Sequence, residues 1–547
     1  MKKNLSIVIL LISLAISQSV FSQTYSFEKG KVPEGWKIDK GVLHISSEKY
    51  KSGSRSLQIK WKQNAVLTIP SPTGISEACR NRNGGMNAWI YNESPTKENL
   101  LFSFRDETGK EVCQLPFLLD FKGWRCIWAK FQGDMNMSSK SNIQSVEIQF
   151  PQHTKEGVTY IDLLEFTSKV SWQNMSDAQY KVNRTDYSLI PDFIGYRNAT
   201  PKVEKVITAE DNQITTITNR LTTWYLGSGQ HSSERWIKMR TENEKTFIRN
   251  GVKAAQKIKI QYTEDHTPQG EPLFPMGAPT IIDGQEAKKF RSINENILLP
   301  LALDYRKNQN DQSLKKALYI YDWFNDQGWA DGSSMGTLCF EKLRSSGYFH
   351  SFFLLKEQLS PEQLKRELQT MNWFTMFGAC YQLPSHAGEV ADNLRALAIP
   401  KLIYALSQND KQEREVALTA FKHYMDNALG IAPGFFGTFK ADFSGYHHRG
   451  SYHSAYYPHA LYAGALIAYL LHDTPYALSE TTLHNLKQGL LTFRFFCADL
   501  EVPAGTVGRF PKGQQILETL LPAFAYTALS FKEPDKAMSV PMERSGR

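Results

Sequence analysis

The chain has 547 residues, 41% of them hydrophobic, with a formal net charge of +8 at pH 7. This length and apolar content predict two or more domains with packed cores. The lysines and arginines are scattered, and no basic run or known nucleic-acid motif appears, which argues against a nucleic-acid partner. The charge suits a polyanionic substrate, although a solvated surface is the simpler explanation of the charge alone.

Residues 1–22 are predicted to be a secretory signal peptide. Lys2 and Lys3 precede an apolar run from Leu5 to about Ile16, and small residues follow. This run is shorter than the ~20 residues that a membrane-spanning helix needs. We therefore expect a protein of the bacterial periplasm or exterior, without a membrane span.

Residues 24–170 are predicted to form a jelly-roll β-sandwich of a carbohydrate-binding-like kind. The segments 57–61 and 146–150 alternate apolar and polar residues, as half-buried strands do. Turn-forming residues separate the strands, for example at 33–36 and 52–55. Short alternating strands of this kind are typical of a sandwich.

The remainder of the chain is predicted to be helical. Residues 171–199 form a polar connector, residues 200–535 form an incomplete α/α toroid that is the catalytic domain, and residues 536–547 form a tail. Apolar residues recur at three- and four-residue spacing in six segments, and Pro400 is expected to kink or split the third of them. The six segments are 313–325, 361–374, 390–406, 414–429, 456–471 and 479–496.

The six cysteines are widely spread and include no CxxC pair, which argues against a zinc or redox site. A disulfide between Cys113 and Cys126 is one interpretation. Buried free thiols are the interpretation that we favour.

The segment 445–457 concentrates histidines and tyrosines beside one arginine. Such groups suit β-elimination on a uronate polymer, in which the carboxylate must be neutralised before a base removes the neighbouring proton. Tyr456 is the candidate base, and Arg509 is the candidate cation that helps the phenol to ionise. Structural roles remain open for both, because tyrosines pack at helix starts and arginines brace loops.

Asn393 and His448 are the candidate partners of the substrate carboxylate. Asn393 lies near a predicted helix start, where either Asp392 or Asn393 could instead act as an N-cap. His448 could instead be a hydrogen-bonded loop histidine. A metal site among the clustered histidines is a further alternative, but no acidic residue accompanies them at ligand spacing.

The chain resembles polysaccharide lyases of family 8, most closely the chondroitinase ABC type. The resemblance runs from 26–36 through 172–177 to 470–476 and the loop 505–511, and it is most specific in the block 446–456. It implies a jelly roll followed by an α/α toroid, and catalysis without a cofactor or metal. By this resemblance the catalytic residues are His448, Tyr456, Arg509 and Asn393. The spacing between His448 and Tyr456 matches the family only to within one residue, so His447 and Tyr457 remain alternates for the two roles.

The predicted substrate is chondroitin sulfate or a related glycosaminoglycan, hyaluronan included. The further candidates for binding it are His447, Arg449, Tyr452 and Arg395. Relatives that also cleave dermatan sulfate carry a histidine pair before a Trp-Gly-Tyr segment. The corresponding stretch of this chain, 343–348, has no histidine, and the next one is His350, so we do not expect that activity.

The C-terminal β domains of the family are absent from this sequence. We therefore expect weakened activity, or a separate polypeptide that supplies these domains. A glycoside hydrolase using Glu389 and Asp442, and a glycan-binding protein without activity, are the alternative functions.

Overall fold

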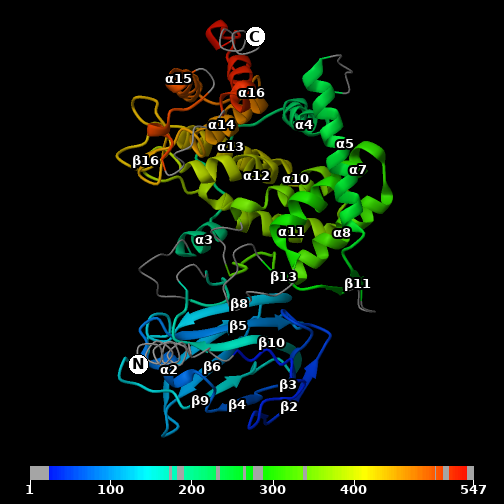
Figure 1. The fold of residues 1–547 in the computed structure, drawn as a ribbon, viewed down its shortest axis with the longest axis vertical. Coiled ribbons are helices and arrows are strands. Elements are labelled where there is room, and N and C mark those ends of the chain that lie inside the picture. Colours follow the sequence, from blue (N-terminus) through cyan, green and yellow to red (C-terminus); the bar gives the residue numbers. More distant parts are fainter. Residues whose placement is uncertain are drawn as a thin grey trace, which may run out of the picture.

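The computed structural model describes residues 24–171, 175–181, 190–228, 234–262, 267–274, 288–336, 342–498, 501–508 and 516–538. It consists of a β-sandwich and a larger helical part, stacked along the long axis of the molecule (Figure 1). The predicted signal peptide, the end of the tail, Cys339 and Arg509 lie outside the described residues.

The sandwich has two five-stranded antiparallel sheets, in the orders β1-β4-β9-β6-β7 and β2-β3-β10-β5-β8. Its core is filled by apolar side chains that alternate along the strands, which confirms the predicted β-sandwich. A short helix, α2 (Ile75–Arg80), accompanies the sheets. The strands are β1 (Lys37–Ile38), β2 (Gly41–Ser46), β3 (Ser56–Lys62), β4 (Val66–Pro70), β5 (Gly85–Asn92), β6 (Asn99–Arg105), β7 (Glu111–Leu118), β8 (Gly123–Lys130), β9 (Ser145–Gln149) and β10 (Glu156–Thr167).

The helical part follows a pattern in which alternate helices pack side by side. Helices α10, α12, α14 and α16 form one such row, and α11, α13 and α15 pack against it. The main helices are α3 (Ile190–Arg197), α4 (Asp211–Leu226), α5 (Arg235–Ala255), α6 (Phe290–Ile293), α7 (Leu299–Asn308), α8 (Asp311–Asp326), α10 (Ser346–Leu355), α11 (Pro361–Thr375), α12 (Ala391–Leu406), α13 (Lys411–Ala428), α14 (Tyr457–Leu471), α15 (Glu480–Phe496) and α16 (Leu517–Leu529).

Short π and 3-10 turns complete the helical part: η2 (Asn294–Leu298), η3 (Lys342–Arg344), η4 (Lys356–Gln358), η5 (Phe377–Cys380) and η6 (Ala504–Thr506). Three two-stranded sheets also lie within it: β11 (Ile260–Tyr262) with β12 (Pro268–Gly270), β13 (Leu273–Phe274) with β14 (Lys288–Lys289), and β15 (Tyr446–His447) with β16 (Gly450–Ser451).

All six predicted helices are present, and the predicted connector contains α3. Pro400 does not split its helix, since α12 continues through it. A proline removes one backbone donor, and the buried packing of α12 on both sides compensates for that loss.

An aromatic layer joins the sandwich to the helical part. Along β5 and β8 the side chains alternate, so that residues such as Ile90 and Ile127 enter the sandwich core while the neighbouring aromatic rings face the other way. These rings are at most 1% exposed: Trp89, Tyr91, Trp124, Trp128 and Tyr160. Their burial leaves no room for a sugar ring, so this face does not support the predicted carbohydrate-binding character of the domain.

Two buried lysines of the sandwich bind the helical part across this layer. Lys49 Nζ donates to Asp326 Oδ1 at 3.0 Å, and Tyr91 donates to the same oxygen at 2.6 Å. Lys51 Nζ donates to the carbonyl oxygens of Leu273 and Gln327 at 2.7 and 2.9 Å. Because these groups are shielded from water, the contacts fix the two parts relative to each other.

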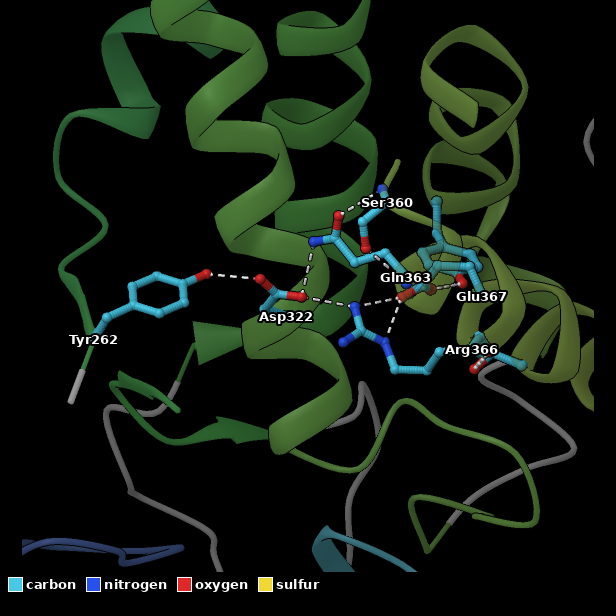
Figure 2. A network of polar contacts seen from close by, with 8 residues as sticks. Tyr262, Asp322, Ser360, Gln363, Arg366 and Glu367 are labelled. Carbon is cyan, nitrogen blue, oxygen red and sulfur yellow. Dashed lines mark hydrogen bonds and ion pairs between the residues drawn. The ribbon is translucent and has the colours of Figure 1, made fainter. Parts of the chain in front are cut away.

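A polar network braces the helices that adjoin this junction (Figure 2). Asp322 of α8 accepts from Tyr262, Gln363 and Arg366, at 2.8, 3.1 and 2.7 Å. Arg366 also pairs with its neighbour Glu367 at 2.9 Å. The network therefore ties β11 and α8 to α11.

The five described cysteines are buried free thiols, Cys113 and Cys126 included. This confirms the favoured interpretation for the described part of the chain. Across the same residues, no helix combines the length and the apolar character that crossing a membrane requires.

Candidate active site

A strained hairpin carries three of the predicted site residues, His447, His448 and Arg449. Strands β15 and β16 are joined by the two-residue loop His448-Arg449, with φ values of 48° and 66°. Tight hairpin loops favour such positive angles, but residues other than glycine adopt them at a cost of about 1 kcal/mol or more each. Both side chains are exposed at the tip of the hairpin. The backbone therefore holds an imidazole and a guanidinium out towards solvent.

The ring of Tyr456 lies among the aromatic side chains of this hairpin. His447 stacks on it with 3.9 Å between ring centroids and 22° between planes. Tyr452 and His448 meet it edge-on, at 5.1 and 5.6 Å. Tyr456 immediately precedes α14 and is 9% exposed. Four of the predicted site residues are thus in mutual contact.

Tyr457, the alternate for Tyr456, points into the helical core instead. Its hydroxyl donates to the carbonyl oxygen of Phe443 at 2.7 Å, and its side chain is fully buried. Burial raises the pKa of this phenol well above its usual value. The ring packs so closely on Gly445 and Gly489 that a Cβ at either glycine would collide with it. Tyr457 is therefore a packing residue.

The loop before Arg509 lies against the same cluster. The backbone N–H of His453 donates to Thr506 at 3.0 Å, and the His453 ring bonds to Ser451 at 2.8 Å. Gly508 has φ 61° and packs directly on the Tyr452 ring. Arg509 follows it and lies outside the described residues. The chain that leads to Arg509 therefore reaches the aromatic cluster.

Asn393 lies in the first turn of α12 with a fixed orientation. Its Nδ2 donates to Glu389 Oε1 at 3.2 Å, and its Oδ1 accepts from Lys342 Nζ at 3.4 Å. The N-cap position belongs to Val390, and no side chain caps this helix end. The alternative role as an N-cap is therefore wrong for Asn393 and for Asp392. The amide nitrogen of Asn393 carries two N–H groups and the bond to Glu389 uses one of them, so a second N–H is left as a donor.

Asp392 is a residue that the sequence alone did not single out for this site. Its Oδ1 accepts from Arg395 Nε at 2.7 Å. Its Oδ2 lies 3.3 Å from Nε2 of His447, within ion-pair range but at an angle poor for a hydrogen bond. Burial opposes ionisation of Asp392, yet the contacts with His447 and Arg395 outweigh it and lower the pKa of the carboxyl group to about 2.

A cavity of about 360 Å³ opens beside Arg395. The guanidinium carbon of Arg395 also lies 5.8 Å from the centre of the Tyr456 ring, so this residue links the cavity to the cluster. Aromatic and charged side chains line it, namely Trp224, Arg291, Glu295, His350, Arg395, His459 and Tyr462. Flat rings beside cations suit a sugar that carries negative charge.

This arrangement offers little support for the two alternatives, hydrolysis by a carboxylate pair and a metal site. Glu389 already accepts from Val390 N–H, Asn393 and Tyr424, and Asp442 accepts from Ser444 N–H. Each carboxylate is therefore held by residues of its own segment or of a neighbouring helix, and nothing shows the two facing each other across a cleft as a hydrolytic pair does. Within the described ranges, no three histidine, cysteine, aspartate or glutamate side chains converge as metal ligands.

Comparison with known families identifies two segments in order. The family model described as "Lyase, N terminal" matches residues 21–182, and the model described as "Lyase, catalytic" matches residues 200–541. The aromatic cluster, Asp392, Asn393 and the cavity all fall within the second segment.

Two curated proteins are similar to most of this chain. A chondroitin sulfate ABC exolyase of Bacteroides thetaiotaomicron is 26% identical over 526 residues, which cover 90% of this chain and 49% of the relative. A chondroitin sulfate ABC endolyase of Proteus vulgaris is 24% identical over 569 residues, which cover 95% of this chain and 54% of the relative. The chain thus spans about half the length of the curated relatives that it matches.

Proposed function

The chain belongs to the polysaccharide lyases of the chondroitinase ABC type, and we propose that it cleaves chondroitin sulfate by β-elimination. The observation that carries this proposal is the stacking of His447 on Tyr456 beside the cavity of Arg395. Arg395 lines this cavity and also lies over the Tyr456 ring, so the arrangement places the stacked phenol and imidazole next to a cavity whose rings and cations suit a charged sugar.

Tyr456 is the proposed base. Its phenolate oxygen accepts the C5 proton of the uronate, the C4–C5 double bond forms, and the bond from C4 to the leaving oxygen breaks. The protonated phenol can then return a proton to that oxygen. Tyr456 suits this role better than Tyr457, whose hydroxyl already donates to Phe443 within the core. By resemblance, Arg509 supplies the charge that favours the phenolate.

His448 and Asn393 are proposed to neutralise the substrate carboxylate. His448 is exposed at the hairpin tip, and the amide of Asn393 has an N–H left to donate, since its bond to Glu389 uses one of two. Hydrogen-bond donors of this kind stabilise the charge that develops as the C5 proton leaves. His447, Arg449, Tyr452 and Arg395 are proposed to bind the polymer around this point.

The double row of helices supports the proposal that this part is an arc of an incomplete α/α toroid. Secretion, a jelly-roll topology and a separate C-terminal β-domain partner remain part of the same proposal. Cleavage of dermatan sulfate is not included, because by the resemblance relatives with that activity carry a histidine pair in the stretch that corresponds to 343–348, and this chain has none there. His350 follows that stretch, and its Nδ1 bonds to the hydroxyl group of Tyr225.

Product chemistry tests the proposal. Chondroitin sulfate incubated with the purified chain should yield products that absorb as conjugated unsaturated uronates. Tyr456→Phe should lower the rate by at least ~100-fold, as expected for the loss of a general base. Tyr457→Phe is the matched control, since it removes a hydroxyl one residue away and should leave turnover within a few-fold of wild type. Saturated products would establish hydrolysis instead.

A further inference from the structure

We propose that Asp392 is a positioning residue that holds His447 and Arg395 against the ring of the base, Tyr456. The inference rests on the proposed function, since it assigns Asp392 a part in the same elimination. Asp392 itself acts through the two side chains that it binds.

The Asp392 carboxylate contacts two side chains, one with each oxygen. Its Oδ1 lies 2.7 Å from both Nε and Nη2 of Arg395, and its Oδ2 lies 3.3 Å from Nε2 of His447. Each partner also contacts Tyr456: His447 stacks on the ring at 3.9 Å, and the Arg395 guanidinium lies over it at 5.8 Å. Both partners of the Asp392 carboxylate therefore contact the same phenol, that of Tyr456.

The carboxylate acts as a fixed anchor. Since the pKa of Asp392 is about 2, its carboxyl group is ionised throughout the neutral range. The groups around His447 are Asp392 on α12 and the rings of His448, Tyr452 and Tyr456 on the hairpin segment. Asp392 is the only anion among these described neighbours, and its attraction for the Nε2 edge keeps the imidazole parallel to the phenol.

Position matters here because the base must meet the C5 proton at close range. Misplacement of a reacting group by about 1 Å can cost about 100-fold in rate. Without the carboxylate, the His447 ring can rotate away from the stack, and the half-exposed Arg395 can turn to solvent. The phenol would then lose two of the neighbours that set its orientation.

A purely structural role is the alternative. Asp392 lies in the first turn of α12, where a negative charge stabilises the positive end of the helix. If this were the whole role of Asp392, losing its charge would lower the stability of the variant. It would not move the His447 ring or change turnover in the folded protein. The experiment therefore needs a readout of ring position and one of kcat.

The variants are Asp392→Asn, Asp392→Glu, His447→Gln and the double variant Asp392→Asn/His447→Gln. Asp442→Asn is the control, because Asp442 is a carboxylate of the adjoining loop whose hydrogen bond, among the described residues, is to Ser444 of its own turn. NMR of protein labelled at the histidine ring carbons reports the position of His447, since stacking on Tyr456 shifts its ring signals. The His447→Gln spectrum assigns those signals, and thermal unfolding confirms that each variant is folded.

We expect Asp392→Asn to lose the stacking shift of His447 and to lower kcat at least about 10-fold, with KM within about 3-fold of wild type. Asp392→Glu should restore part of the stacking shift and part of kcat, and Asp442→Asn should change neither quantity. The double variant should be no slower than the slower single variant, because both changes break the same contact. A retained stacking shift in Asp392→Asn, or additive losses in the double variant, would overturn the inference. Wild-type products without an unsaturated uronate would refute the proposed function alone, since the NMR comparison does not depend on the reaction.

Discussion

At the scale of single residues, the site depends on a carboxyl group whose ionisation is coupled to folding. The pKa of Asp392 is about 2 in the folded chain, against an ordinary value of 3.8. Because the folded pKa is the lower one, the coupling stabilises the fold above about pH 4. The stabilisation is lost as the pH falls from there towards 2, and it amounts to at most about 2.5 kcal/mol for a carboxyl group shifted this far.

We therefore expect wild type to have a higher free energy of unfolding than Asp392→Asn at pH 7, and the difference to shrink below pH 4. Urea unfolding followed at several pH values between 7 and 3 measures it. A difference that stays constant over this range would mean that the contacts with His447 and Arg395 do not stabilise the ionised form.

At the scale of elements, the hairpin of β15 and β16 keeps its loop residues in an unfavourable backbone conformation. Arg449 has φ 66°, which glycine adopts without strain. Arg449→Gly should stabilise the chain by about 1 kcal/mol and at the same time weaken binding of the polymer, because a cation is lost from the hairpin tip. Thermal unfolding and KM for chondroitin sulfate check the two effects.

Gly450→Ala is the matched control in the same hairpin. Gly450 has no positive φ, and the space around its Cβ position is open, so alanine should leave stability and KM nearly unchanged. Destabilisation by Arg449→Gly would show that the arginine side chain contributes more to the fold than its backbone angle costs.

The helices show which patterns a sequence reveals. Helices α8, α11 and α13 were predictable because their apolar residues recur on one face and a side chain caps each start. Helices α4, α5 and α10 were missed. The apolar residues of α4 and α5 also recur on one face, but glutamate, not serine, asparagine or aspartate, precedes each of these two helices. The aromatic cluster was predictable because its members are close in sequence. Asp392 was not, because only the packing of α12 beside the hairpin brings it to His447.

At the scale of the whole molecule, the sandwich and the helical part share a buried polar junction. The Lys49–Asp326 pair is almost fully buried, with side chains 6% and 5% exposed. Lys49→Met would leave the Asp326 carboxylate without its cation, and loss of one partner of a buried pair costs about 3–5 kcal/mol. We expect this variant to unfold at markedly lower urea concentration, with the two parts unfolding in separate transitions.

Arg105→Met is the control for that prediction. Its ion pair with Glu147 lies within the sandwich, with side chains 31% and 32% exposed, and such pairs contribute at most about 1 kcal/mol. Equal effects of the two variants would show that the junction does not couple the two parts.

The central claim is elimination with Tyr456 as the base, and one comparison tests it most directly. Wild type, Tyr456→Phe and Tyr457→Phe are incubated with chondroitin sulfate, and the unsaturated uronate is followed by its absorbance. We expect wild type and Tyr457→Phe to form this product, and Tyr456→Phe to form it at least ~100-fold more slowly. Cleavage without the unsaturated product, or near-normal turnover by Tyr456→Phe, would contradict it.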